Sequence, residues 1–189
     1  MTVEEIKQHL RLMSHPTRGL VAETYRSKAR IPSTALPGHY EASRPMGSVL
    51  YILVSPAAQL RLHRIRSDQM YHHYLGSPLE ILLLYGDGTH EVRWIGGDLR
   101  KGAEPQLFIP GDTFHISRLP EGAEYALLGS SESPGAESPD VELGMTEELV
   151  ADYPDAAELL RAFVATHSTE GAWPARPVHA DDAAQRGAD

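Results

Sequence analysis

The chain has 189 residues, enough for one substantial hydrophobic core but not for a second independent one. It contains no cysteine, which excludes disulfides and thiolate–metal sites from these residues. Its 26 acidic and 17 basic residues give a net charge of −9 without a basic stripe. This balance argues against nucleic acid and anionic membranes and leaves small molecules as the expected partners.

The first segment predicts a short amphipathic helix over about 2–13, ended by Pro16. Thr2 and Glu5 have the spacing of a capping box, in which each side chain bonds the other residue's backbone N–H. Apolar residues recur at helical spacing at Ile6, Leu10 and Met13. The segment is acidic and unlike a secretory signal, and no apolar run is long enough to span a bilayer. Together with the lack of cysteine, this favours a cytoplasmic protein.

After the helix, the sequence predicts a barrel of short strands over about 20–145. A strand is expected over 20–26, followed by a loop rich in Pro and Gly over 31–47. Further strand-like runs are SVLYILV, AQLRLHRI, LEILLLY, HEVRWI, QLFI, TFHIS and EYALLG. Turn-like pieces separate them, and Asp87-Gly88 marks the clearest hairpin. Many short strands with such turns are typical of an all-β sandwich or barrel.

The C-terminal region changes from strands to helices. Helical spacing over 146–165, interrupted at Pro154, predicts helices that pack on the outside of the barrel. Residues 167–189 are rich in Ala, Pro, Asp and Gly, and we expect them to form a disordered tail. The expected organisation is one domain over 1–166 with flanking helices.

Strand alternation brings polar side chains together around RLHRIRSDQMYHHYLG, residues 61–76. Side chains two positions apart share a face of a strand, so Arg61 lies on the face of His63. After the Ser-Asp corner, one face carries Gln69, Tyr71 and His73. If His63 and Gln69 face inward, these side chains converge inside the barrel. A second motif much later, FIPGDTFHIS, adds His115 to the candidates.

The spacing of these residues resembles the cupin superfamily. Its first motif has two histidines one residue apart, then a glutamate and a glycine, and its second has a Pro-Gly-like turn before a third histidine. Here His63, Ile65, Gln69 and Gly76 stand at the first-motif positions, and His115 follows the turn of PGDTFH.

The resemblance is closer to one family, the cupin-5 proteins (DUF985), and covers about residues 10–165. Its motifs resemble HPTRGLVAETYRS (15–27), HRIRSDQMYHHYLGSPLEILLLYGDG (63–88), PQLFIPGDTFH (105–115) and LLGSSESPGAESPDVELGMTEELVADYP (127–154). The resemblance implies an all-β fold with flanking helices, a double-stranded β-helix (jelly-roll) barrel. It also implies a homodimer with a small-molecule pocket inside each barrel. It names no reaction, because the family's biochemical function is poorly defined.

The chain departs from the family pattern at the position of a metal ligand. Gln69 replaces the glutamate, and Thr17-Arg18 replace a Glu-Gly pair. A metal site needs about three protein donors, and a Gln amide oxygen is a weak one. The candidate ligands for one divalent metal ion are His63, His115, His73 and Gln69. The pocket therefore either binds metal weakly through imidazoles or works without metal, and we favour the second.

Imidazoles that titrate near neutral pH can remove and return protons, so His63 is the candidate base, with Tyr71 or His115 as the acid. The candidate substrate-binding residues are Arg61, Gln69, His73 and Glu23. For three of these residues the sequence leaves two positions open. Arg61 either contacts an anion inside the barrel or lies at its rim in water, and Glu23 is either a pocket carboxylate or part of a rim salt bridge. His73 either faces the pocket or packs at a dimer face.

The first hypothesis is a cupin enzyme that isomerises or epimerises a small polar metabolite by proton transfer. The second is a non-catalytic cupin that binds a small molecule, with Gln69 marking a decayed metal site. A third is a metal-dependent decarboxylase or dioxygenase, which requires a Lewis-acidic or redox-active ion.

Overall fold

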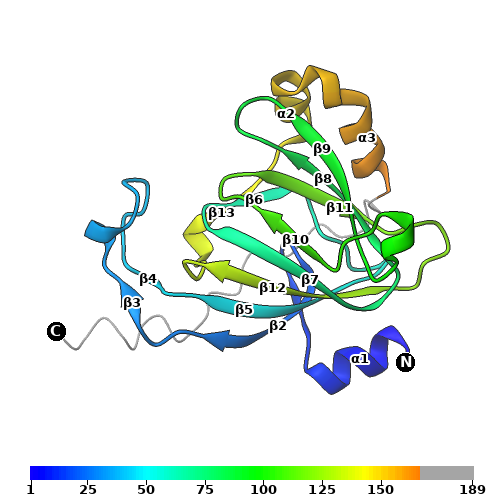
Figure 1. Cartoon of the computed structure of the whole chain (residues 1–189), viewed down its shortest axis with the longest axis horizontal. Helices are drawn as coiled ribbons and strands as arrows, with labels where there is room; N and C mark the ends of the chain where they lie inside the picture. Colours follow the sequence, from blue (N-terminus) through cyan, green and yellow to red (C-terminus); the bar gives the residue numbers. More distant parts are fainter. Residues whose placement is uncertain (167–189) are drawn as a thin grey trace.

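Strands from most of the chain pair into two facing antiparallel sheets, as the computed structural model of residues 1–166 shows (Figure 1). The first sheet has the order β1-β2-β5-β12-β7-β10 and the second the order β13-β6-β11-β8-β9. The first comprises β1 (Met13–His15), β2 (Gly19–Arg26), β5 (Ser48–Val54), β12 (Ala126–Ser133), β7 (Asp68–Gly76) and β10 (Gln106–Ile109). The second comprises β13 (Val141–Leu143), β6 (His63–Ile65), β11 (Phe114–Arg118), β8 (Leu79–Leu84) and β9 (His90–Ile95). The predicted jelly-roll barrel is confirmed.

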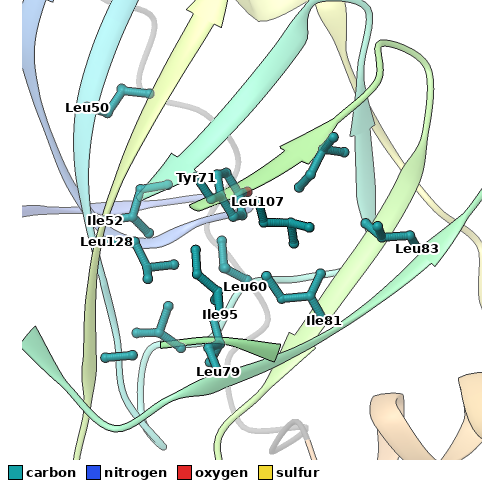
Figure 2. Packing of buried hydrophobic residues seen from close by; sticks show 13 residues of the cluster. Leu50, Ile52, Leu60, Tyr71, Leu79, Ile81, Leu83, Ile95, Leu107 and Leu128 are labelled. Carbon is teal, nitrogen blue, oxygen red and sulfur yellow. The ribbon is translucent and has the colours of Figure 1, made fainter. Parts of the chain in front are cut away.

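The apolar core fills the space between the two sheets. On β8, Leu79, Ile81 and Leu83 point inward, where they meet residues of the first sheet such as Ile52 and Leu128. Figure 2 shows these side chains in one cluster, in which the ring of Tyr71 lies beside Leu107. Leu82 and Leu84 point outward into a second cluster, which explains the unbroken apolar run from Ile81 to Leu84 in β8.

Helix α1 (Val3–Leu10) covers the outer face of the first sheet, where Ile6 packs near Leu53 and Leu127. Its predicted capping box is present, with Thr2 and Glu5 bonded reciprocally. The helix is shorter than predicted because Arg11 adopts a left-handed conformation, φ 55°, and ends it. Met13 consequently lies in β1 with an exposed side chain, and Leu12 takes the buried position.

The C-terminal helices cover the outer face of the second sheet (Figure 1, orange). They are α2 (Thr146–Asp152), a short 3-10 turn η4 (Pro154–Ala156) and α3 (Ala157–Ala165). Leu149, Leu160 and Phe163 pack against Phe114 and Ile116 of β11. Both sheets therefore carry a helical cover on the side away from the shared core.

Two predicted strands differ in extent from the observed ones. The run over 58–65 forms a strand only from His63 onward, because residues 58–62 make isolated bridges at Ala58 and Leu60 instead of a ladder. β12 continues four residues beyond the predicted end at Gly129, to Ser133. The predicted loop over 31–47 also contains short elements. These are β3 (Arg30–Ile31), η1 (Ser33–Ala35) and β4 (Arg44–Pro45), and two further 3-10 turns are η2 (Leu99–Lys101) and η3 (Ser138–Asp140).

Among residues 1–166, no helix combines the length and apolar character needed to cross a membrane. The predicted disordered tail, residues 167–189, lies outside the described residues.

Candidate functional site

Polar side chains occupy one half of the barrel interior. On the first sheet, Glu132 of β12 pairs in register with Ser48 of β5 and Gln69 of β7, and all three have the parity of the inward residues. The next inward row holds Ser130 and Tyr71. Every one of these side chains is buried, with at most 4% of its surface exposed. We call this region the polar half; it also contains Arg18, which pairs with Glu132, and the neighbouring His115 and His63, the first of which contacts Tyr71.

His63 and His115 face the polar half from the second sheet. They are directly paired residues of β6 and β11, and their ring centroids are 4.3 Å apart. His63 Nδ1 lies 2.7 Å from the Arg61 carbonyl oxygen, and His115 Nδ1 lies 3.1 Å from the Thr113 carbonyl oxygen. A carbonyl oxygen only accepts, so each neutral imidazole carries its proton on Nδ1 and presents the Nε2 lone pair to the interior.

The phenol of Tyr71 connects the two sheets across the polar half. Its oxygen lies 3.1 Å from His115 Nε2, and since that nitrogen carries no proton, the phenol donates. Of the two candidate acids, Tyr71 is therefore the one that holds a proton inside the site. His115 accepts this bond, whereas His63 Nε2 has no hydrogen-bond partner.

Burial keeps these groups uncharged at neutral pH. Desolvation lowers the pKa of His115 to about 4, and it lowers the pKa of His63 well below its usual value with a further contribution from His115. Desolvation also raises the pKa of Tyr71 to about 12. The positive charge of Arg18 further lowers the pKa of both imidazoles.

A buried ion pair lies beside the histidines. Arg18 Nη1 is 2.6 Å from Glu132 Oε1, and Ser48 Oγ donates to Glu132 Oε2 at 2.8 Å. Arg18 bridges to Leu60, and the Thr17 carbonyl accepts from the Arg61 N–H, so backbone pairing fixes its position. Gly19 follows in a left-handed conformation, φ +69°, and a Cβ there would lie 2.7 Å from the Ala58 carbonyl oxygen. This close backbone approach requires a glycine.

Five buried side-chain atoms of the described chain lack a hydrogen-bond partner, and four of them belong to the polar half; the fifth, Ser117 Oγ, lies on β11 at the residue paired with Ile81 of the apolar core. The four in the polar half are Arg18 Nε, His63 Nε2, Gln69 Nε2 and Ser130 Oγ. Buried polar groups of folded proteins are almost always satisfied, and leaving one unsatisfied costs on the order of 1–3 kcal/mol. Several such atoms in one region are typical of a site that receives a ligand or bound water.

The structure brings four of the predicted residues together and places three elsewhere. His63, Gln69, Tyr71 and His115 share the polar half. Arg61 precedes β6 and is exposed, so the strand parity that placed it on the face of His63 does not extend to it. Glu23 is exposed in a salt bridge with Arg26. His73 lies 3.0 Å from the Ser77 carbonyl oxygen, near the end of its strand.

The sequence pattern did not identify Arg18 and Glu132, the charged residues of the site. Arg18 stands out in the sequence only as a departure from the family pattern. Glu132 lies beyond the predicted end of the strand over 124–129. Continuing the alternation from Leu128 through Ser130 would have placed Glu132 inward.

The donor set does not fit the metal site implied by the fold family. Within residues 1–166, no three His, Cys, Asp or Glu side chains are grouped to hold an ion. Ile65 stands at the second histidine position and Gln69 at the glutamate. The nearest carboxylate, Glu132, is already bonded to Arg18 and Ser48. Two imidazoles and a neutral amide are fewer and weaker donors than a divalent cation usually requires.

Comparison with known proteins agrees with this fold. Residues 4–144 match the family described as Cupin superfamily (DUF985). A hypothetical protein from Leishmania major aligns with a TM-score of 0.78 and 22% identity, over 86% of this chain and 98% of its own. A crystal structure of a Shewanella oneidensis protein gives 0.74 and 25%, over 86% and 97%.

A more distant structure is oxalate decarboxylase from Bacillus subtilis, with a TM-score of 0.47 and 12% identity, over 79% of this chain and 36% of its own. No curated protein matches the sequence. The family match spans most of the chain, from the first helix to the last strand. The chain therefore belongs to the cupin superfamily, in its DUF985 family.

Proposed function

We propose that the protein is an enzyme that isomerises or epimerises a small polar metabolite by proton transfer in the polar half of the barrel. His63 is the base, Tyr71 the acid and Gln69 an orienting group. The observation that carries this proposal is the free Nε2 of His63. It is a buried lone pair on a neutral imidazole, with no protein partner, close to a phenol that holds a proton.

The reaction balances within these groups. His63 Nε2 removes a proton from the carbon next to a substrate carbonyl, and the electron pair moves to the carbonyl oxygen as an enolate. Tyr71 turns its O–H from His115 to that oxygen, and Gln69 Nε2 donates a second hydrogen bond. Isomerisation of an α-hydroxy carbonyl compound needs a second proton transfer: the hydroxyl proton moves to the enolate oxygen by way of the Tyr71 phenol, and His63 returns its proton to the former carbonyl carbon. Epimerisation needs the enolate to turn over between the two steps, so that His63 returns the proton to the other face of the same carbon. Such general-base assistance typically contributes about 10²–10⁴ in rate.

Solvent exchange tests the proposal with a panel of compounds, because the isotope reports proton removal whichever compound is the substrate. The protein is incubated in D2O with small aldoses, ketoses, hydroxy acids and hydroxy amides, and deuterium next to the carbonyl is measured by NMR. We expect exchange with at least one compound, reduced about 10²-fold or more in His63→Gln and reduced in Tyr71→Phe. His9→Gln, at an exposed position of α1, serves as the matched control and retains the wild-type rate.

A non-catalytic binding cupin is the second candidate. Its support is the deep burial of the site together with Gln69, a residue that binds by hydrogen bonds but does not transfer protons. This function predicts compounds that bind at the polar half and take up no deuterium above the rate of His63→Gln. Such a result would exclude the enzyme and retain the site. The homodimer, the small-molecule ligand and the cytoplasmic location stay predictions.

A further inference from the structure

The charges of the polar half cancel within the protein. Arg18 contributes one positive charge and Glu132 one negative charge, 2.6 Å apart and both nearly inaccessible to water. The other ionisable groups there, His63, His115 and Tyr71, are almost completely buried, and this burial favours the uncharged form of each. A ligand that enters this region therefore finds no uncompensated charge.

The unpartnered atoms define what the ligand must present. Arg18 Nε and Gln69 Nε2 carry N–H groups and can only donate, so the ligand needs acceptor oxygens on that side. His63 Nε2 carries a lone pair and can only accept, so the ligand needs an O–H or N–H there. The Ser130 hydroxyl can donate or accept a hydrogen bond.

We infer that the ligand is an uncharged small molecule with a carbonyl-type acceptor next to a hydroxyl or N–H donor, and that Glu132 sets this selectivity by neutralising Arg18. The inference rests on the proposed location of the site in the polar half, but not on the proton-transfer chemistry.

An uncharged ligand fits the polar half better than a carboxylate does. A buried arginine without a counterion is a strong carboxylate anchor, because it offers charge-assisted and bidentate hydrogen bonds. Here Glu132 already occupies one edge of the guanidinium and cancels its charge. A carboxylate ligand would leave a net negative charge in a region that excludes water, which is costly. A carbonyl oxygen uses the same free N–H groups without that cost.

Lactamide and lactate provide a matched pair of probes, since they differ in charge but hardly in shape. Binding of each to the full chain at pH 7 is followed by NMR through the imidazole signals of His63 and His115. For the wild type we expect lactamide to bind at least about tenfold more tightly than lactate. In Glu132→Gln, which leaves the Arg18 charge unpaired, the preference reverses and lactate binds more tightly.

A double variant separates charge from structural disturbance. Arg18→Met/Glu132→Gln removes both charges, so it should not gain affinity for lactate even though Glu132 is changed. Two results would overturn the inference and leave the site intact. The first is that lactate binds the wild type as tightly as lactamide does, and the second is that a folded Glu132→Gln variant shows no higher affinity for lactate. If neither probe shifts the His63 or His115 signals, both the site and the inference are wrong. The wild-type comparison decides the question even if Glu132→Gln does not fold.

Discussion

The two halves of the barrel interior are built from the same strands but use them differently. On β5 and β12, the paired inward residues Ile52 and Leu128 belong to the apolar core. Four residues along each strand, at the same inward parity, Ser48 and Glu132 form part of the polar half. The apolar half satisfies every requirement of a stable core, whereas the polar half leaves buried donors and acceptors unpaired. Sites that leave buried polar groups unpaired, in a fold that otherwise satisfies them, are usually functional sites.

The largest effect on stability is expected at the Arg18–Glu132 ion pair of the polar half. Arg18→Met leaves the Glu132 carboxylate buried with Ser48 as its remaining partner, so we expect a loss of about 3–5 kcal/mol in the free energy of unfolding. Urea denaturation measures this loss. The double variant Arg18→Met/Glu132→Gln should recover most of it, because no buried charge then lacks a partner. A loss below about 1 kcal/mol in the single variant would show that water reaches Glu132.

The stability contributed by the apolar half should depend on the size of its side chains and not on charge. Ile81→Ala removes a fully buried side chain from the centre of the core in Figure 2, and we expect a loss of about 2–5 kcal/mol. The same denaturation experiment measures it. Leu143→Ala, whose side chain is 44% exposed on β13, is the control and should change stability by about 0.5 kcal/mol or less. Equal effects in the two variants would contradict the assignment of the core.

The polar half should also make stability depend on pH. The folded pKa of His115 is about 4 against an ordinary value of 6.5, so the unfolded chain binds more protons between these values. The free energy of unfolding therefore falls as the pH falls from 6.5 towards 4. His115→Gln should reduce this slope by about 1 kcal/mol per pH unit. His9→Gln, at an exposed position of α1, is the control and should keep the wild-type slope; an equal reduction there would argue against His115 as the source.

The smallest expected effect comes from an orphaned amide. Gln69→Leu replaces a buried side chain whose Nε2 has no partner by an apolar one of similar size. We expect a change in stability within about 1 kcal/mol, of either sign, because removing an unsatisfied group offsets the altered packing. Ligand binding at the polar half, followed with the lactamide probe, should weaken in the same variant. A large loss of stability with unchanged binding would make Gln69 a structural residue.

The fold was predictable because its signals are local and repeated. Short apolar runs, the Asp87-Gly88 hairpin and the interruption at Pro154 all predict elements that the structure contains. Four site residues were predictable through strand alternation and the family resemblance. Alternation left two positions open for Arg61, the pocket and the rim, and it holds only inside a strand, which here begins at His63. The pairing of Arg18 with Glu132 joins residues 114 positions apart, and a single sequence carries no signal for such a contact.

That separation has a consequence for the order in which the protein is made. At a synthesis rate of roughly 5–20 residues per second, Glu132 follows Arg18 by about 6–23 s. During that interval the arginine has no carboxylate from β12 to bond and stays in water. β12 lies between β5 and β7, so the first sheet cannot join until it arrives. The polar half is thus complete only in chains whose long-range strand pairing is complete, so we expect a truncated or stalled chain to lack the proposed ligand site.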